Sequence, residues 1–338
     1  MTLNILWFIL IALLYAGFFF LEGFDFGVGI LLPSLGRKDV DRRTIINTIG
    51  PHWDGNEVWL VVAGGATFAA FPQWYATLFS GFYLGFFLLL LALIVRGVAF
   101  EFRSKLAETR WRNGWDSALS ITSFIAAFLL GVVFTNLVRG VPIDAKMQFT
   151  GTFFSLLNPV SLFGGLTLVM LFTYQGAVFL NLKLTEGLLV RANRAARSYS
   201  LAALILMLGW FVALYFTPSA FKSKGLVSLI LPLLAVLTLL ISGWMLQTKK
   251  DGRAFIFSSL TVVLVVAALF FALFPNLMIS TTAAANSLNI TNAASSNYTL
   301  KVMSIVAAVM LPVVIAYQVW TYYVFRKRIK ADAKTLTY

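Results

Sequence analysis

Acidic residues occur in pairs inside two apolar stretches near the start of the chain. Glu22 and Asp25 are three residues apart, and Asp54 and Glu57 repeat this spacing. Residues at i and i+3 share a helix face, so each pair would point in one direction if these stretches are helices. A carboxyl group within a membrane usually faces protein or water and often marks a route for ions or protons. The pairs are therefore candidate proton-relay groups, and a purely structural role is the alternative.

One cation lies in a neighbouring apolar stretch. Arg96 is followed five residues later by Glu101, and we expect these two residues to form a structural ion pair. Arg96 could also neutralise one of the paired acids and so lock the helices together. Glycines flank the acids, and a glycine allows another helix backbone to approach closely. We therefore expect the first three helices to pack with their acids facing one another, through the glycines at positions 23, 27, 29, 64 and 65.

The sequence has a single histidine, His52, and no cysteine. A haem with two histidine ligands therefore cannot be held by this chain alone, and thiolate metal sites and disulfides are excluded. A lone histidine at a helix start is more often a hydrogen-bonding residue than a haem ligand. The adjacent Trp53 could stack on a quinone ring, although anchoring at the membrane interface explains most tryptophans in such chains.

The elements that must position these residues are expected to be membrane-spanning helices. Of the 338 residues, 60% are apolar and 12% are charged, whereas about 25% of residues are charged in a soluble domain. Apolar runs of about 20 residues, the length that crosses a bilayer, recur along the chain. We predict an all-α integral membrane protein whose residues 1–338 form a single transmembrane domain with about nine spans. The expected helices cover residues 4–31, 53–71, 75–100, 116–138, 158–182, 199–217, 226–247, 254–275 and 301–325.

Charge and composition describe the segments between these helices. Prolines such as Pro33 and Pro72 mark expected breaks, because proline disfavours helix at the preceding residue. Most of the 26 lysines and arginines follow the first, third, fifth, seventh and ninth helices. This bias predicts an external N-terminus and a cytoplasmic C-terminus, with the acids toward the cytoplasmic side. Because the excess positive charge is spread over these segments, we expect no nucleic-acid partner. The uncharged stretch 281–299 is expected to be a flexible outer loop.

Short motifs surround the acids, and others follow later in the chain. The first are GFDFGVG at 23–29, GPHWDGNEVW at 50–59, AGGATFAAFP at 63–72, FSGFY at 79–83, RGVAFEFR at 96–103 and TRWRN at 109–113. The later ones are LNP at 157–159, TYQGA at 173–177 and FIFSSL at 255–260. Together these motifs resemble subunit II of the cytochrome bd quinol oxidase family. The likeness covers nearly the whole chain, and the string around His52 is its most specific part.

The resemblance implies a respiratory enzyme of the bacterial cell membrane that oxidises quinol and reduces dioxygen to water. It implies that two b-type haems and one d-type haem lie in a partner, subunit I, and that this chain binds no cofactor. A small single-helix subunit is expected to complete the complex. By resemblance, Trp53 and Asp54 fall where a family proton route begins near the subunit interface, and Asp25 matches the acid of the glycine motif. Glu57 stands where other members can have a neutral amide.

Three interpretations of the chain stay open at this point. The first is a non-haem oxidase subunit that supports assembly with subunit I and delivers cytoplasmic protons. The second is a free-standing transporter coupled to protons or cations, which acids at mid-membrane and an inverted repeat would favour. Here the acids lie toward one side and no repeat is evident. The third is a scaffold for subunit I without a proton route. The predicted route comprises Asp54, Trp53, Asp25, Glu22, Glu57 and His52.

Overall fold

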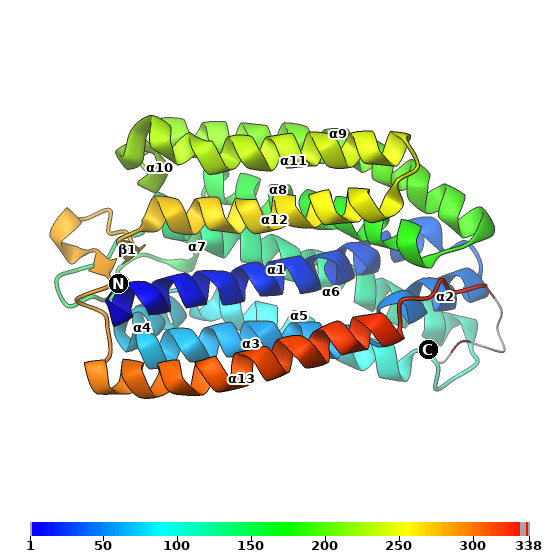
Figure 1. Cartoon of the computed structure of the whole chain (residues 1–338), viewed down its shortest axis with the longest axis horizontal. Helices are drawn as coiled ribbons and strands as arrows, with labels where there is room; N and C mark the ends of the chain where they lie inside the picture. Colours follow the sequence, from blue (N-terminus) through cyan, green and yellow to red (C-terminus); the bar gives the residue numbers. More distant parts are fainter. Residues whose placement is uncertain (1, 332–335, 337–338) are drawn as a thin grey trace.

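A computed structural model describes residues 2–331 and residue 336, and most of these residues are helical. The long helices run side by side along the long axis of the molecule (Figure 1). The helices are α1 (Leu3–Leu35), α2 (Asp39–Ile49), α3 (Trp53–Ala70), α4 (Pro72–Gly81), α5 (Tyr83–Phe102), α6 (Thr109–Arg139), α7 (Phe153–Leu156), α8 (Pro159–Lys183), α9 (Glu186–Phe216), α10 (Ala220–Lys224), η1 (Gly225–Leu229), α11 (Ile230–Gln247), α12 (Asp251–Leu273), η2 (Ala284–Asn286) and α13 (Asn297–Val324). The strands are β1 (Asn276–Met278) and β2 (Leu288–Asn289).

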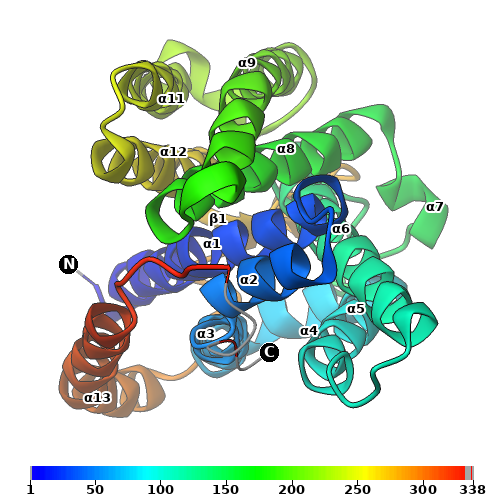
Figure 2. The same cartoon turned by 90° about the vertical axis from the view of Figure 1, so that its right-hand side faces the viewer.

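Eight helical segments of the described chain are long and apolar enough to cross a membrane. They comprise α1, α5, α6, α8, α9, α12, α13 and the segment from α10 to α11. The 18-residue α3 is the ninth long helix among the described residues, and its first turns are polar because they contain Asp54, Asn56 and Glu57. At 1.5 Å per residue it is about 27 Å long. It runs beside α13 (Figures 1 and 2). The expected all-α membrane architecture is confirmed, and the orientation of the termini stays a prediction.

Several helix boundaries differ from those expected. Helix α1 continues through Pro33 to Leu35, and α9 begins at Glu186 instead of residue 199. Hydropathy marks only the apolar part of a helix, and a helix can extend past the hydrocarbon layer into water with charged residues. The expected third helix is divided at Phe82 into α4 and α5, and α4 begins at Pro72, where proline is favoured.

Helix α1 lies at the centre of the bundle and packs against α3, α6, α8 and α12 (Figure 2). It approaches α8 closely at Gly27, where a Cβ atom would lie 1.8 Å from the backbone oxygen of Phe172. The close approach of another backbone expected at the glycines of α1 is therefore confirmed at Gly27, but the neighbouring helix is α8 and not one of the first three expected helices. The same expectation is wrong for α3, because a Cβ atom at Gly64 or Gly65 would meet no described atom within 4 Å. These two glycines border an apolar cavity instead.

The segment between α12 and α13 is held by hydrogen bonds at the end of the bundle that contains the N-terminus. Strands β1 and β2 pair antiparallel. The backbone oxygen of Ile143 accepts hydrogen bonds from Ser280 Oγ at 2.8 Å and from Asn286 Nδ2 at 3.2 Å. The first part of the stretch expected to be a flexible loop is therefore bonded to the segment that follows α6, because its many Ser, Thr and Asn side chains find backbone partners.

Candidate functional site

Helices α1, α3 and α5 bring two acids to one buried arginine. Arg96 Nη1 lies 2.7 Å from Glu22 Oε1, and both side chains are completely buried. The same nitrogen donates a hydrogen bond to Glu57 Oε1, and the Glu57 side chain is 19% exposed. The guanidinium also lies over the rings of Phe26 and Phe100, with 4.9 and 5.3 Å to their centroids. Arg96 is therefore enclosed by carboxyl groups and aromatic faces, as a buried cation requires.

The second acid of α1 is bound by an amide from α3. Asn56 Nδ2 donates a hydrogen bond to Asp25 Oδ2 at 2.6 Å and lies 3.3 Å from the Leu21 oxygen. On its other side, Asn56 Oδ1 accepts hydrogen bonds from Gln318 Nε2 at 2.7 Å and from the Tyr322 hydroxyl at 3.0 Å. This chain of contacts joins α1, α3 and α13 at the same level of the bundle.

Two carboxyl groups thus contact the guanidinium of Arg96, and a third, that of Asp25, lies beside them. If Glu22, Asp25 and Glu57 were all ionised, Arg96 would balance only one of three negative charges in a poorly solvated interior. Like charges held together in such surroundings do not all ionise readily. Within the described part of the chain, Asp25 Oδ1 and Glu22 Oε2 have no hydrogen-bond partner. A proton bound at either of these oxygens would therefore displace no hydrogen bond.

Trp53 and His52 lie at one end of this cluster. The Trp53 ring stacks on Phe100 with 4.7 Å between centroids and 18° between planes. The His52 ring lies flat against Tyr322 at 4.3 Å and 5°, and the residue is 2% exposed. Burial, with a smaller contribution from the positive charge of Lys183, lowers the pKa of His52 to about 4. His52 is therefore neutral at physiological pH.

Two predicted site residues lie outside the cluster. The expected ion pair between Arg96 and Glu101 is wrong, because Glu101 is exposed and Arg96 pairs with Glu22 and Glu57. Positions five apart on a helix are separated by about 140° around its axis, so the two side chains of α5 point apart. Asp54 is also exposed and forms no ion pair with the described residues, so only three of the four paired acids meet.

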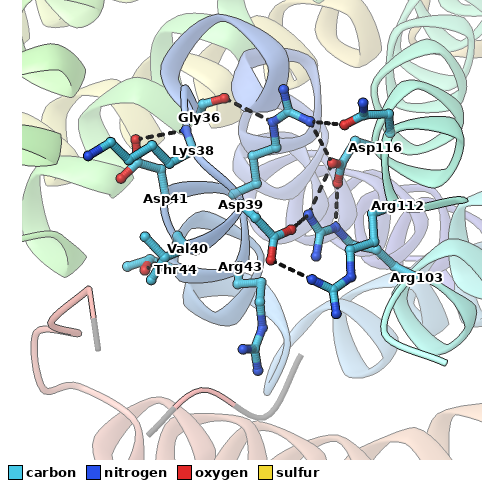
Figure 3. Close-up of polar contacts among 12 residues, drawn as sticks. Gly36, Lys38, Asp39, Val40, Asp41, Arg43, Thr44, Arg103, Arg112 and Asp116 are labelled. Atoms are coloured by element: carbon cyan, nitrogen blue, oxygen red, sulfur yellow. Dashed lines mark hydrogen bonds and ion pairs between the residues drawn. The ribbon is translucent and has the colours of Figure 1, made fainter. Parts of the chain in front are cut away.

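A second charged cluster ties α2 to α5 and α6 at the end of the bundle opposite the N-terminus (Figure 3). Arg103 binds Asp116 through two hydrogen bonds of 2.5 and 3.0 Å and also reaches Asp39 at 2.8 Å. Arg42 contacts Asp116 at 3.1 Å, and Arg112 contacts Asp39 at 2.9 Å. Because every acid here bridges two arginines, this cluster holds the connecting segments together.

Sequence reasoning missed the neutral members of the site. Asn56 lies inside the GPHWDGNEVW motif, but an amide does not titrate, so the pattern of charged residues does not indicate it. Gln318 and Tyr322 are four residues apart in α13 and so share a helix face. A glutamine among apolar residues of an expected membrane helix was the available signal, since such side chains tend to bond across helices.

The donor set of the described residues does not fit a haem or metal ion. No group of three His, Cys, Asp or Glu residues in residues 2–331 is arranged to hold a metal. His52 has the wrong setting for an axial ligand, because its ring is stacked on Tyr322 and buried against Phe325. We therefore derive no chemistry at this site from a bound cofactor.

Comparisons with known proteins agree along nearly the whole chain. The sequence profile of the family described as cytochrome bd terminal oxidase subunit II matches residues 3–325. The cytochrome bd ubiquinol oxidase subunit 2 of Bacillus subtilis is 43% identical over 337 residues, which cover 100% of this chain and 99% of that protein. The cytochrome bd-I ubiquinol oxidase subunit 2 of Escherichia coli K12 is 37% identical over 379 residues, covering 100% and 98%.

A solved structure has the same fold. A chain of the bd oxidase from Geobacillus thermodenitrificans superposes with a TM-score of 0.79 and 19% sequence identity. The match covers 96% of this chain and 98% of that chain. At this sequence identity the similarity shows a shared fold alone, which is the all-helical arrangement described above.

Proposed function

The chain belongs to the cytochrome bd terminal oxidase subunit II family, and from this premise we propose that its buried acid cluster delivers cytoplasmic protons for the reduction of dioxygen to water. It is a multi-pass protein of the bacterial membrane and a subunit of a respiratory terminal oxidase. A subunit II requires a partner, subunit I. The observation that carries the proposal is the sharing of Arg96 by Glu22 and Glu57, with Asp25 beside them.

The proposed route runs from the surface of this chain toward α1. Asp54 is exposed and lies one helical turn before Glu57, which is partly exposed and contacts Arg96. Glu22 and Asp25 are completely buried behind it. In the proposal, Asp54 collects a proton near the boundary with subunit I, Glu57 passes it inward, and Glu22 and Asp25 hold it. Exposure that falls from one acid to the next supports this order.

Trp53 and His52 serve the route without carrying a proton in this proposal. Trp53 covers the side of the site by stacking on Phe100, and it leaves no room beside Gly97, where a Cβ atom would lie 3.3 Å from its ring. His52 supports Tyr322 by stacking and stays neutral. Both residues therefore limit access of water to the acids, which keeps proton exchange confined to the carboxyl groups.

The redox chemistry belongs to the partner in this proposal. We place two b-type haems, one d-type haem and the quinol that donates electrons on subunit I, with a small single-helix subunit and membrane lipid completing the complex. The misfit of His52 to haem ligation supports this division. The chain then contributes assembly with subunit I and the delivery of protons.

The test uses the whole oxidase purified with this chain carrying E22Q, D25N, D54N or E57Q. Each amide keeps the shape of the side chain but cannot carry the proton. We expect E22Q and D25N to lower quinol-driven oxygen consumption and proton uptake by about a hundredfold, as for the loss of a positioned proton-transfer group. The matched control is E101Q, which alters an exposed acid next to the site. Full haem content with unchanged turnover and proton uptake in both E22Q and D25N would reduce the chain to a scaffold.

A further inference from the structure

We infer that Asn56 is a positioning residue for Asp25 and that it makes Oδ1 of Asp25 the oxygen that exchanges protons. The inference rests on the proposed function, because it assigns an atom within the proposed route. Asn56 is completely buried, and both polar atoms of its side chain are engaged. Its position in α3 places it between the acid of α1 and the polar residues of α13.

The direction of the hydrogen bond distinguishes the two oxygens of Asp25. The amide nitrogen of Asn56 can only donate, so Oδ2 at 2.6 Å must be the accepting oxygen. A proton on Oδ2 along this contact would face another proton. Oδ1 is buried and has no hydrogen-bond partner among residues 2–331. A proton carried by Asp25 therefore belongs on Oδ1.

Helix α13 keeps the amide in this orientation. Gln318 Nε2 donates to Asn56 Oδ1 at 2.7 Å. The Tyr322 hydroxyl lies 3.0 Å from Asn56 Oδ1 and 2.9 Å from Asn56 Nδ2, so it can bond either atom, and Gln318 sets the orientation of the amide. If the amide were reversed, its oxygen would face the carboxyl group of Asp25, and these groups could pair only with a proton on Oδ2. Its nitrogen would face the Gln318 nitrogen, and two donors do not pair in either protonation state of Asp25. The three helices together therefore fix which oxygen of Asp25 is bonded.

Other charged and titratable groups around Asp25 remain in place when Asn56 is changed. They are Glu22 on the same helix, Glu57 on α3, Arg96 on α5 and Tyr322 on α13. Asn56→Leu keeps a similar shape and removes only the hydrogen bonds. A change in the titration of the site in this variant can therefore be assigned to the lost amide.

The experiment compares N56L with N181L in the purified oxidase. Asn181 is a completely buried amide on α8 whose polar atoms have no hydrogen-bond partner among the described residues, so N181L is a matched control. We expect N56L to lower turnover about tenfold and to shift the pH–activity profile about one unit toward higher pH, because ionised Asp25 loses a donor. The infrared band of the protonated carboxyl group should also move in N56L, because Oδ2 becomes free to take the proton. N181L should leave the profile and the band unchanged.

Each outcome of this experiment either supports or overturns the role inferred for Asn56. A wild-type profile and band in N56L, with D25N still impaired, overturn the role of Asn56 and leave the proposed function standing. Unchanged turnover in D25N overturns this inference, and unchanged turnover in E22Q as well overturns the proposed function. If N56L fails to assemble, Q318L replaces it, because this change removes the donor that orients the amide from α13. A shifted profile in Q318L supports the inference, and an unshifted profile overturns it.

Discussion

Arg96 Nη1 on α5 lies 2.7 Å from Glu22 Oε1 on α1, and neither side chain is accessible to solvent. This contact organises the candidate site, because the same nitrogen also binds Glu57 of α3. A cation held between two helices in a poorly solvated interior is stable only while its partners remain. The strength of the arrangement can be measured by removing each partner in turn.

Replacing Arg96 by leucine should prevent assembly of the oxidase. The change leaves three neighbouring carboxyl groups without a buried cation, and breaking a buried pair in this way costs about 3–5 kcal/mol. Arg96→Lys keeps the charge and should retain part of the stability. The measurement is the yield and thermal unfolding midpoint of the haem-containing complex. Glu101→Gln should change stability by less than about 0.5 kcal/mol, and an R96L complex as stable as the wild type would contradict the prediction.

The charged cluster at the C-terminal end of α5 should depend on one of its pairs much more than on another. Asp116→Asn removes the buried one of the two acidic partners of Arg103 and should cost about 3–5 kcal/mol. Arg112→Gln breaks a contact with Asp39, which is 43% exposed, and should cost less than about 1 kcal/mol. Thermal unfolding of the two purified variants checks the contrast. Equal losses in both variants would show that burial does not determine how much these ion pairs contribute to the free energy of unfolding.

Buried His52 should make the protein less stable as the solution becomes acidic. Its pKa falls from 6.5 to about 4 on folding, because burial and the charge of Lys183 disfavour the protonated ring. The unfolded chain therefore binds this proton first as the pH falls. The contribution of neutral His52 to the free energy of unfolding is fully present above pH 6.5. It decreases as the pH falls from 6.5 to about 4, and the total loss is about 3 kcal/mol.

The His52 prediction is checked by the unfolding midpoint of the oxidase across this pH range. His52→Phe keeps an aromatic ring against Tyr322 but cannot take up the proton. The variant should show a flatter decline than the wild type. Identical declines in the two proteins would assign the acid sensitivity to other groups.

The absence of cysteine from the sequence makes the membrane orientation directly measurable. Lys105→Cys and Lys146→Cys place single thiols in two exposed connecting segments at opposite ends of α6. The excess of basic residues predicts that residue 105 is cytoplasmic and residue 146 external. A thiol reagent that cannot cross membranes should therefore label K146C in intact cells and K105C only after lysis. Labelling of K105C alone in intact cells would reverse the predicted orientation.

Some contacts of the candidate site can be predicted from the sequence, and others cannot. The spacing of Glu22 from Asp25 and their apolar surroundings predict a buried acidic face on the first helix, and the structure contains it. The same reasoning placed Asp54 with Glu57 and paired Arg96 with Glu101. Asp54 and Glu101 are instead exposed. A spacing of three or five residues does not determine which face of a helix is turned toward the neighbouring helices.

Composition and motifs are enough to identify a helical membrane protein and the family that it resembles. Runs of about 20 apolar residues can bury their backbone polar groups in lipid only as helices, so composition is sufficient for the first conclusion. The folded structure is needed to show which acids contact Arg96 and that Asn56 bonds to Tyr322, 266 residues away in the chain. Such contacts depend on how the side chains of several helices pack together, and this information is not contained in the pattern of any single helix.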